Sequence, residues 1–89
     1  MEALSREWSD RLGELEEAVY GDAMTAVRSL DAPEEVRQGY AKSAVGLLAD
    51  AQEALAAAAG EDGRVRALAD AWVRLEALNR EVAAFGRDA

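Results

Sequence analysis

Apolar side chains recur at intervals of three and four residues along almost the whole of this 89-residue chain. Residues with this spacing lie on the same face of an α-helix. A helix with one apolar face must bury that face against another element, so the pattern predicts an all-α fold with a core formed between helices. A chain of this length makes one domain, and we expect it to span residues 1–89.

Three helices are expected, over residues 3–30, 32–59 and 63–86. The apolar stripe of the first helix consists of Leu4, Trp8, Leu12, Leu15, Val19, Ala23, Ala26 and Leu30. The stripe of the second consists of Val36, Tyr40, Ala44, Leu47, Leu48, Ala51, Leu55 and Ala58. The stripe of the third consists of Val65, Leu68, Trp72, Leu75, Asn79 and Val82, with Leu78 and Phe85 beside it. Trp8 and Trp72 are central in their stripes, which predicts that both are core residues. Asn79 is either buried, where it would fix the helix register, or at the rim of the core.

Local signals mark the two connections between the helices. Asp31 and Glu34 have the spacing of a capping box, with Pro33 in the first turn of the second helix. Gly60 is expected to end that helix in the left-handed conformation. Two short connections between helices of similar length predict antiparallel neighbours, and therefore an up-down-up three-helix bundle. Self-association of this bundle into a homo-oligomer stays open.

The composition removes several classes of chemistry. The chain has no Cys and no His, so it lacks the thiolate and imidazole groups on which most nucleophilic, general-base and transition-metal sites depend. We therefore expect no enzyme activity, no cofactor and no metal. The net charge of −8 argues against direct binding to nucleic acid or to anionic lipid. No apolar run is long enough to cross a membrane and the N-terminus is acidic, which favours a cytoplasmic protein.

The negative charge is concentrated in the first helix. Residues 1–31 hold 3 basic and 8 acidic side chains, a net charge of −5. Glu7, Asp10, Glu14 and Glu17 step by 3, 4 and 3, so they form a column on the face opposite the apolar stripe. This column is either a solvated face, a metal-binding set, an imitation of a nucleic-acid backbone or a docking surface for a basic protein.

A second apolar group lies on the same helix, at Tyr20, Met24 and Val27. On a regular helical wheel these three residues lie roughly 110° away from the main stripe. Either a neighbouring helix covers them, or they form a partly exposed patch for a partner, since Tyr and Met suit adaptable contacts.

The hypothesis that follows is a protein-binding module, acting as an adaptor or an inhibitor. Its partner-binding residues would be Glu7, Asp10, Glu14, Glu17, Tyr20, Met24 and Val27, and its partner a protein with a basic surface. One alternative is a phage-type inhibitor of a nucleic-acid enzyme, acting as an acidic nucleic-acid mimic that is steered into a basic groove. Another is a structural subunit of a larger helical assembly.

Overall fold

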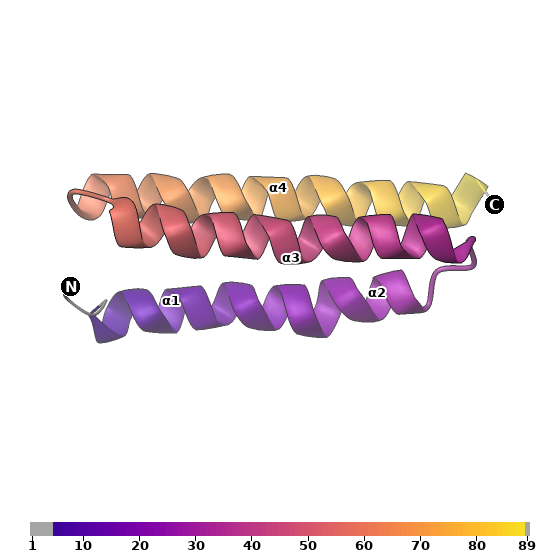
Figure 1. The fold of residues 1–89 in the computed structure, drawn as a ribbon, viewed down its shortest axis with the longest axis horizontal. Helices are drawn as coiled ribbons and strands as arrows, with labels where there is room; N and C mark the ends of the chain where they lie inside the picture. Colours follow the sequence, from indigo (N-terminus) through magenta and orange to yellow (C-terminus); the bar gives the residue numbers. More distant parts are fainter. Residues whose placement is uncertain (1–4, 89) are drawn as a thin grey trace.

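The computed structural model of the protein describes residues 5–88, and the side chains of residues 5–87, as an elongated helical molecule with extents of 45 × 18 × 17 Å. Its elements are α1 (Arg6–Glu17), the π-helical segment η1 (Ala18–Ala23), α2 (Met24–Arg28), α3 (Glu34–Ala57) and α4 (Glu61–Asp88). The first three elements follow one another without a break and form a single rod. Figure 1 shows this rod beside α3 and α4, and the three pack against one another as in a helix bundle. The all-α prediction is confirmed for this part of the chain; Leu4 lies outside it.

The first rod begins where Ser5 precedes α1. Ser5 has extended backbone angles, and its hydroxyl accepts a 3.5 Å hydrogen bond from the Trp8 N–H. A Ser in this position satisfies one of the N–H groups that the first helical turn leaves without a partner. Glu7 lies in the same turn, where its charge complements the positive end of the helix dipole.

The segment η1 widens the helix in the middle of the first rod. At its end the Met24 N–H donates to the Val19 carbonyl, five residues earlier, which is the hydrogen bond of a π-helix. The buried residues here are Leu15, Val19, Ala23 and Val27, at three successive steps of four. In a helix of ~3.6 residues per turn these steps would drift by about 120°. The wider turn absorbs this drift and keeps one face against the core.

This change of phase corrects the stripe expected from the sequence. Ala26 was assigned to the core and is exposed, whereas Val27 is buried. The regular spacing of three and four would have continued from Ala23 to Ala26. With η1 in place, the core face passes instead through Val27 and then Leu30.

The connection between the first two rods does not contain the expected capping box. Pro33 is the N-cap of α3, which begins at Glu34, and no side chain caps it. The Pro33 carbonyl accepts from the Val36 and Arg37 N–H groups, at 3.0 and 3.2 Å. The capping-box prediction for Asp31 is wrong because the helix begins two residues later than expected, leaving Asp31 too far from its first turn.

The second connection is also simpler than predicted. α3 ends at Ala57, and Ala58 turns the chain with extended backbone angles of φ −64° and ψ 132°. Gly60 is not left-handed, since no residue from 5 to 88 has a positive φ. Its carbonyl instead accepts from the Arg64 N–H at 3.2 Å, so α4 begins two residues before the predicted start. The extended Ala58 makes a left-handed glycine unnecessary here.

The core is a single apolar cluster, and its most extensive contact joins α3 to α4. Ala51 of α3 and Ala71 of α4 lie together in this contact, next to Leu47. Ala44, Ala51 and Ala71 are buried, and small side chains allow two helices to approach closely. The larger core residues of α3 and α4 are Leu47, Leu48, Leu55, Leu68, Leu75, Leu78 and Val82. No helix within residues 5–88 is both long and apolar enough to cross a membrane.

The burial of Ala71 shifts the core face of α4 away from the predicted stripe. Trp72 is 37% exposed, and Val65 and Asn79 are exposed. The prediction that Trp72 is a core residue is therefore wrong, and Asn79 lies at the rim rather than in the core. Trp8 is confirmed as a core residue, with 4% of its surface exposed. A large indole at position 71 would hold α4 away from α3, whereas Ala71 lets the two helices touch.

Deletion of Gly21 tests the role of η1. Without this residue, the buried residues after Val19 would follow at steps of three and four, as in a regular α-helix. We expect the variant to fold and to gain about 1 kcal/mol in the free energy of unfolding, because a helical glycine is removed and no core residue leaves its place. Urea unfolding followed by far-ultraviolet circular dichroism measures this change.

Deletion of Gly13 is the matched control. It also removes one helical glycine, but it rotates Trp8 by about 100° relative to Leu15. The free energy of unfolding of this variant should fall by on the order of 3 kcal/mol or more, as expected when a buried Trp leaves the core. Equal losses from the two deletions would mean that η1 does not set the phase of the helix.

Candidate functional site

The four carboxylates of the acidic column lie on the exposed face of α1. Glu7, Asp10, Glu14 and Glu17 are all exposed. At ~1.5 Å per residue the column is about 15 Å long. The geometry expected from the spacing is therefore present, and the column points away from the bundle core.

The charges along this column are not equivalent. Glu7 forms an ion pair with Arg11, with 2.7 Å between Oε1 and Nη2. The Arg11 guanidinium also lies over the Trp8 ring, 4.6 Å from its centroid, which fixes it beside Glu7. The other ion pair found among residues 5–87 joins Arg74 to Asp50. The uncompensated charge of the column therefore belongs to Asp10, Glu14 and Glu17.

The three residues of the second apolar group differ in how far they are buried. Tyr20 is 54% exposed, Met24 is half-buried against the core, and Val27 is only 2% exposed. Val27 is thus a core residue and not part of an exposed patch, because η1 turns it inward. Tyr20 and Met24 are four residues apart and stay on the same side of the first rod, along one edge of it. Of the two expectations for this group, coverage by neighbouring helices holds for Val27, and exposure holds for Tyr20.

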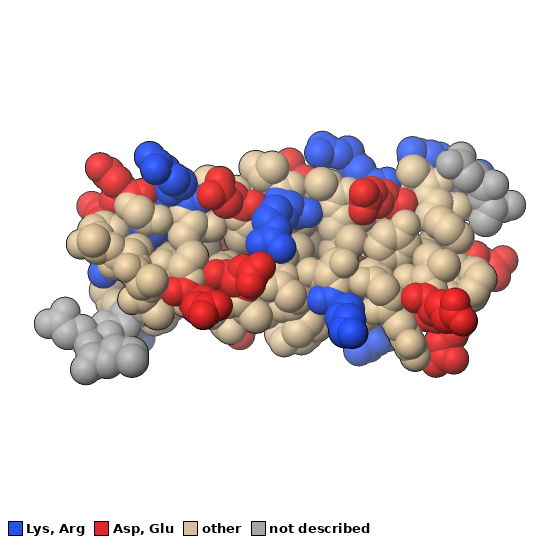
Figure 2. All heavy atoms as spheres, turned by 45° about the horizontal axis from the view of Figure 1, so that its top comes forward, with Lys and Arg blue, Asp and Glu red and all other residues tan. Residues whose placement is uncertain are grey.

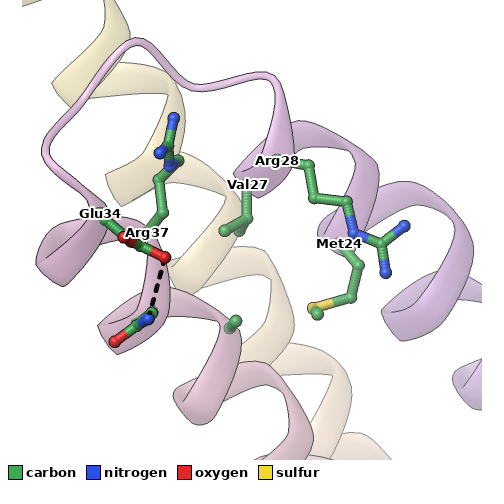
Figure 3. A pocket seen from close by; sticks show the side chains of 7 residues that line it. Met24, Val27, Arg28, Glu34 and Arg37 are labelled. Carbon is green, nitrogen blue, oxygen red and sulfur yellow. Dashed lines mark hydrogen bonds between the residues drawn. The ribbon is translucent and has the colours of Figure 1, made fainter.

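An open groove between α2 and α3 continues from this edge. Its volume is about 400 Å³, and its lining residues are Met24, Val27, Arg28, Glu34, Arg37, Gln38 and Ala41. Figure 3 shows Met24 and Val27 on one side of the groove and Glu34 and Arg37 on the other. The Gln38 amide donates to Glu34 at 3.2 Å, and Arg37 donates to the Leu30 carbonyl at 3.5 Å. The groove therefore has an apolar floor and a polar rim.

Sequence reasoning missed this groove, and only part of it had a signal in the sequence. Met24 and Val27 were singled out by their spacing, but the α3 side of the groove consists of residues that look like an ordinary solvated helix start. Glu34, Arg37 and Gln38 meet Met24 only because the connection through Pro33 folds α3 back along α2.

The column, the exposed tyrosine and the groove lie next to one another. Glu17 lies less than one turn before Tyr20 and Met24 lies about one turn after it, so the three follow one another along the first rod. We call this continuous surface the α1 ribbon; its residues are Glu7, Asp10, Glu14, Glu17, Tyr20 and Met24. It begins with carboxylates, continues with an exposed aromatic ring and ends at the apolar floor of the groove.

The α1 ribbon offers surface contacts of several chemical kinds. No polar or charged residue within 5–87 is buried, so its carboxylates reach solvent directly. The described residues contain no group of three or more acidic side chains placed to hold a metal ion. What the ribbon presents is a row of hydrogen-bond acceptors beside an aromatic ring, which suits contact with the basic and apolar side chains of another protein.

Comparison with family models, with curated proteins and with solved structures finds no match to this chain. The candidate site therefore rests on its own geometry.

A pair of substitutions tests the division between Tyr20 and Val27. Val27→Ala should lower the free energy of unfolding by about 2 kcal/mol, because it removes two buried methyl groups and leaves a cavity. Tyr20→Ala should change it by less than about 1 kcal/mol, since more than half of this side chain is exposed. Thermal and urea unfolding measure both. A larger loss for Tyr20→Ala than for Val27→Ala would contradict the assignment.

Proposed function

We propose that this chain is an up-down-up three-helix bundle that acts as a protein-binding module, as an adaptor or an inhibitor, and docks through the α1 ribbon on a partner with a basic surface. The observation that carries the proposal is the order of groups along the ribbon, in which uncompensated carboxylates, the exposed Tyr20 ring and a groove with an apolar floor follow one another along the first rod.

Each part of the ribbon has a separate physical role in such a contact. A net charge of −8 attracts a basic surface over a distance and raises the association rate, especially at low salt. Asp10, Glu14 and Glu17 then pair with Lys or Arg side chains of the partner. Tyr20 supplies a rigid aromatic anchor, the type of residue that carries much of the energy at interfaces. The groove beside Met24 accepts an apolar side chain from the partner.

Binding rather than catalysis is the activity that these features support. The charged groups of the ribbon all stand in solvent, where their hydration is that of ordinary surface residues. A docking surface uses such groups directly, because its rim is polar and solvent-accessible while its centre is apolar.

A nucleic-acid mimic is the second candidate, and the acidity of the ribbon favours it. The spacing of the charges along the ribbon, however, differs from that of a nucleic acid. Asp10, Glu14 and Glu17 span about 10 Å of helix at ~1.5 Å per residue, or one charge per ~5 Å. A DNA duplex carries one per ~1.7 Å. The ribbon therefore fits a basic protein surface with scattered Lys and Arg residues better than a groove built for a duplex.

Neutralisation of the three uncompensated carboxylates tests the proposal. A photo-reactive benzophenone side chain at position 20 should cross-link a partner in cells of the source organism, whereas one at Val45, which is exposed on α3, should not. The purified partner should then bind the variant Asp10→Asn, Glu14→Gln, Glu17→Gln at least ~10-fold more weakly, mainly through a slower association rate. Surface plasmon resonance at several salt concentrations measures the affinity and both rates.

The matched control removes the same number of charges elsewhere, as Glu53→Gln, Glu61→Gln, Glu81→Gln. These residues are exposed on α3 and α4. Their loss should slow association only slightly, through the change in total charge. An equal loss of affinity in both triple variants would show that net charge, and not the ribbon, is recognised. Identical cross-links from positions 20 and 45 would also contradict the proposal.

A further inference from the structure

The outward face of α4 has a regular pattern that the bundle does not use. Its residues step by 4, 3, 4, 3 and 4 along the helix and all are exposed: Asp62, Arg66, Ala69, Val73, Glu76 and Arg80. On the helical wheel this row lies opposite the buried stripe of α4. Val73 is 62% exposed, the most of any large apolar side chain in the described residues. A row spaced in this way runs straight along one face of the helix, so the corresponding face of a second helix can lie against it over its whole length.

More apolar surface flanks this row on one side. Val65 is 51% and Trp72 is 37% exposed, and they are seven residues apart on one line of the helix. With Val73 they are three of the five large apolar side chains that are exposed among the described residues, so α4 carries most of this surface. Figure 2 shows that the face turned toward the viewer carries acidic and basic side chains in alternating small groups, with uncharged surface between them.

The row is complementary to itself when it is read in the reverse direction. If a second α4 lies antiparallel to the first, with the midpoint between Ala69 and Val73 in register, Ala69 faces Val73 of the other copy. Arg66 then faces Glu76, and Asp62 faces Arg80. Every charged position meets the opposite charge, and the two apolar positions meet each other in the centre.

We propose that this face binds a second copy of the chain, forming a two-fold symmetric dimer in which the two α4 helices pack antiparallel. A two-fold axis requires a surface that is complementary to itself, and the α4 row satisfies this condition. The axis crosses the helix pair at the level of residue 71, so the Trp72 side chains of the two copies lie on the same side of the pair, close to the axis. This pairing covers the indole surface that remains exposed in the single chain.

The charge distribution along the chain also favours α4 as the contact between copies. Two molecules with a net charge of −8 repel each other, and the repulsion is weakest where they meet through the segment with the smallest net charge. Residues 61–89 hold 5 basic and 6 acidic side chains, whereas residues 1–31 hold 3 and 8. The dimer thus places the acidic first rods away from the contact.

The contact is small, because one helix from each copy supplies most of it. Interfaces of this kind are at the weak end of the size range and dissociate on dilution. Sedimentation velocity should therefore show monomer at about 1 μM and increasing amounts of dimer toward about 1 mM, the range in which such weak complexes dissociate. Monomer alone at every concentration would overturn the proposal.

Charge reversal identifies the surface. Arg66→Glu and Glu76→Arg, made separately, each place like charges opposite each other at two symmetric positions, and each should weaken self-association by at least ~10-fold. An equimolar mixture of the two variants restores both pairs, because one copy then carries only acidic and the other only basic side chains at these positions. The mixture should form a dimer nearly as strong as that of the native chain.

The mixture also distinguishes a loss of the contact between copies from a loss of helix stability. The substitution Arg66→Glu puts a third carboxylate four residues from both Asp62 and Asp70, which weakens the helix itself. Mixing does not reverse such a loss, so a rescued dimer reports the contact between copies. The control pair, Lys42→Glu and Glu53→Arg, changes residues of α3 that are exposed and should leave self-association unchanged. Self-association that is unaffected by Arg66→Glu, or a mixture that does not associate, would overturn the proposal.

Discussion

The contact between α3 and α4 is the constraint on which the rest of the structure depends. Ala51 and Ala71 lie together where the two helices pack, and buried leucines from both helices surround them. Burying each such leucine contributes roughly 1.5–3 kcal/mol, and close packing adds dispersion contacts. The first rod then packs on the surface of this pair, mainly through Trp8, Leu15, Val19 and Val27. Because α4 uses Ala71 to reach α3, its larger Trp72 is left at the edge, where it becomes part of an exposed surface.

The segment η1 connects the fold to the candidate site. It allows four core residues in succession to be four apart, and by doing so it turns Val27 inward while Tyr20 stays outside. Such π-helical turns are uncommon and often occur at functional positions. Here the turn lies where the acidic column ends and the groove between α2 and α3 begins, so the same local change of helix geometry sets the core contact and the order of groups along the α1 ribbon.

The fold class, the number of rods and most of the α3 core follow from the spacing of apolar residues. The failures have a common cause, which is that spacing alone does not say how closely two helices approach. Trp72 was predicted to be a core residue because it is central in its apolar stripe, but the buried face of α4 passes through its neighbour Ala71. Val27 was assigned to a second apolar group away from the main core stripe because a regular helix of ~3.6 residues per turn was assumed. The groove was not foreseen because Glu34 and Arg37 join it only through tertiary structure. The exposed acidic column was foreseen, since it needs only one helix.

The two proposed surfaces lie on different helices, and this separation has a consequence for binding. A dimer formed through α4, as proposed, would leave both α1 ribbons open, one on each copy. A partner with a single basic patch would then bind monomer and dimer with the same intrinsic affinity, because neither ribbon changes on association. A partner with two patches at the correct distance would gain avidity of up to about 10²–10⁴-fold, since the second contact becomes intramolecular. Such a partner would in turn favour the dimer by mass action. Weak self-association through a nearly neutral helix and docking through an acidic one can therefore reinforce each other without sharing a residue.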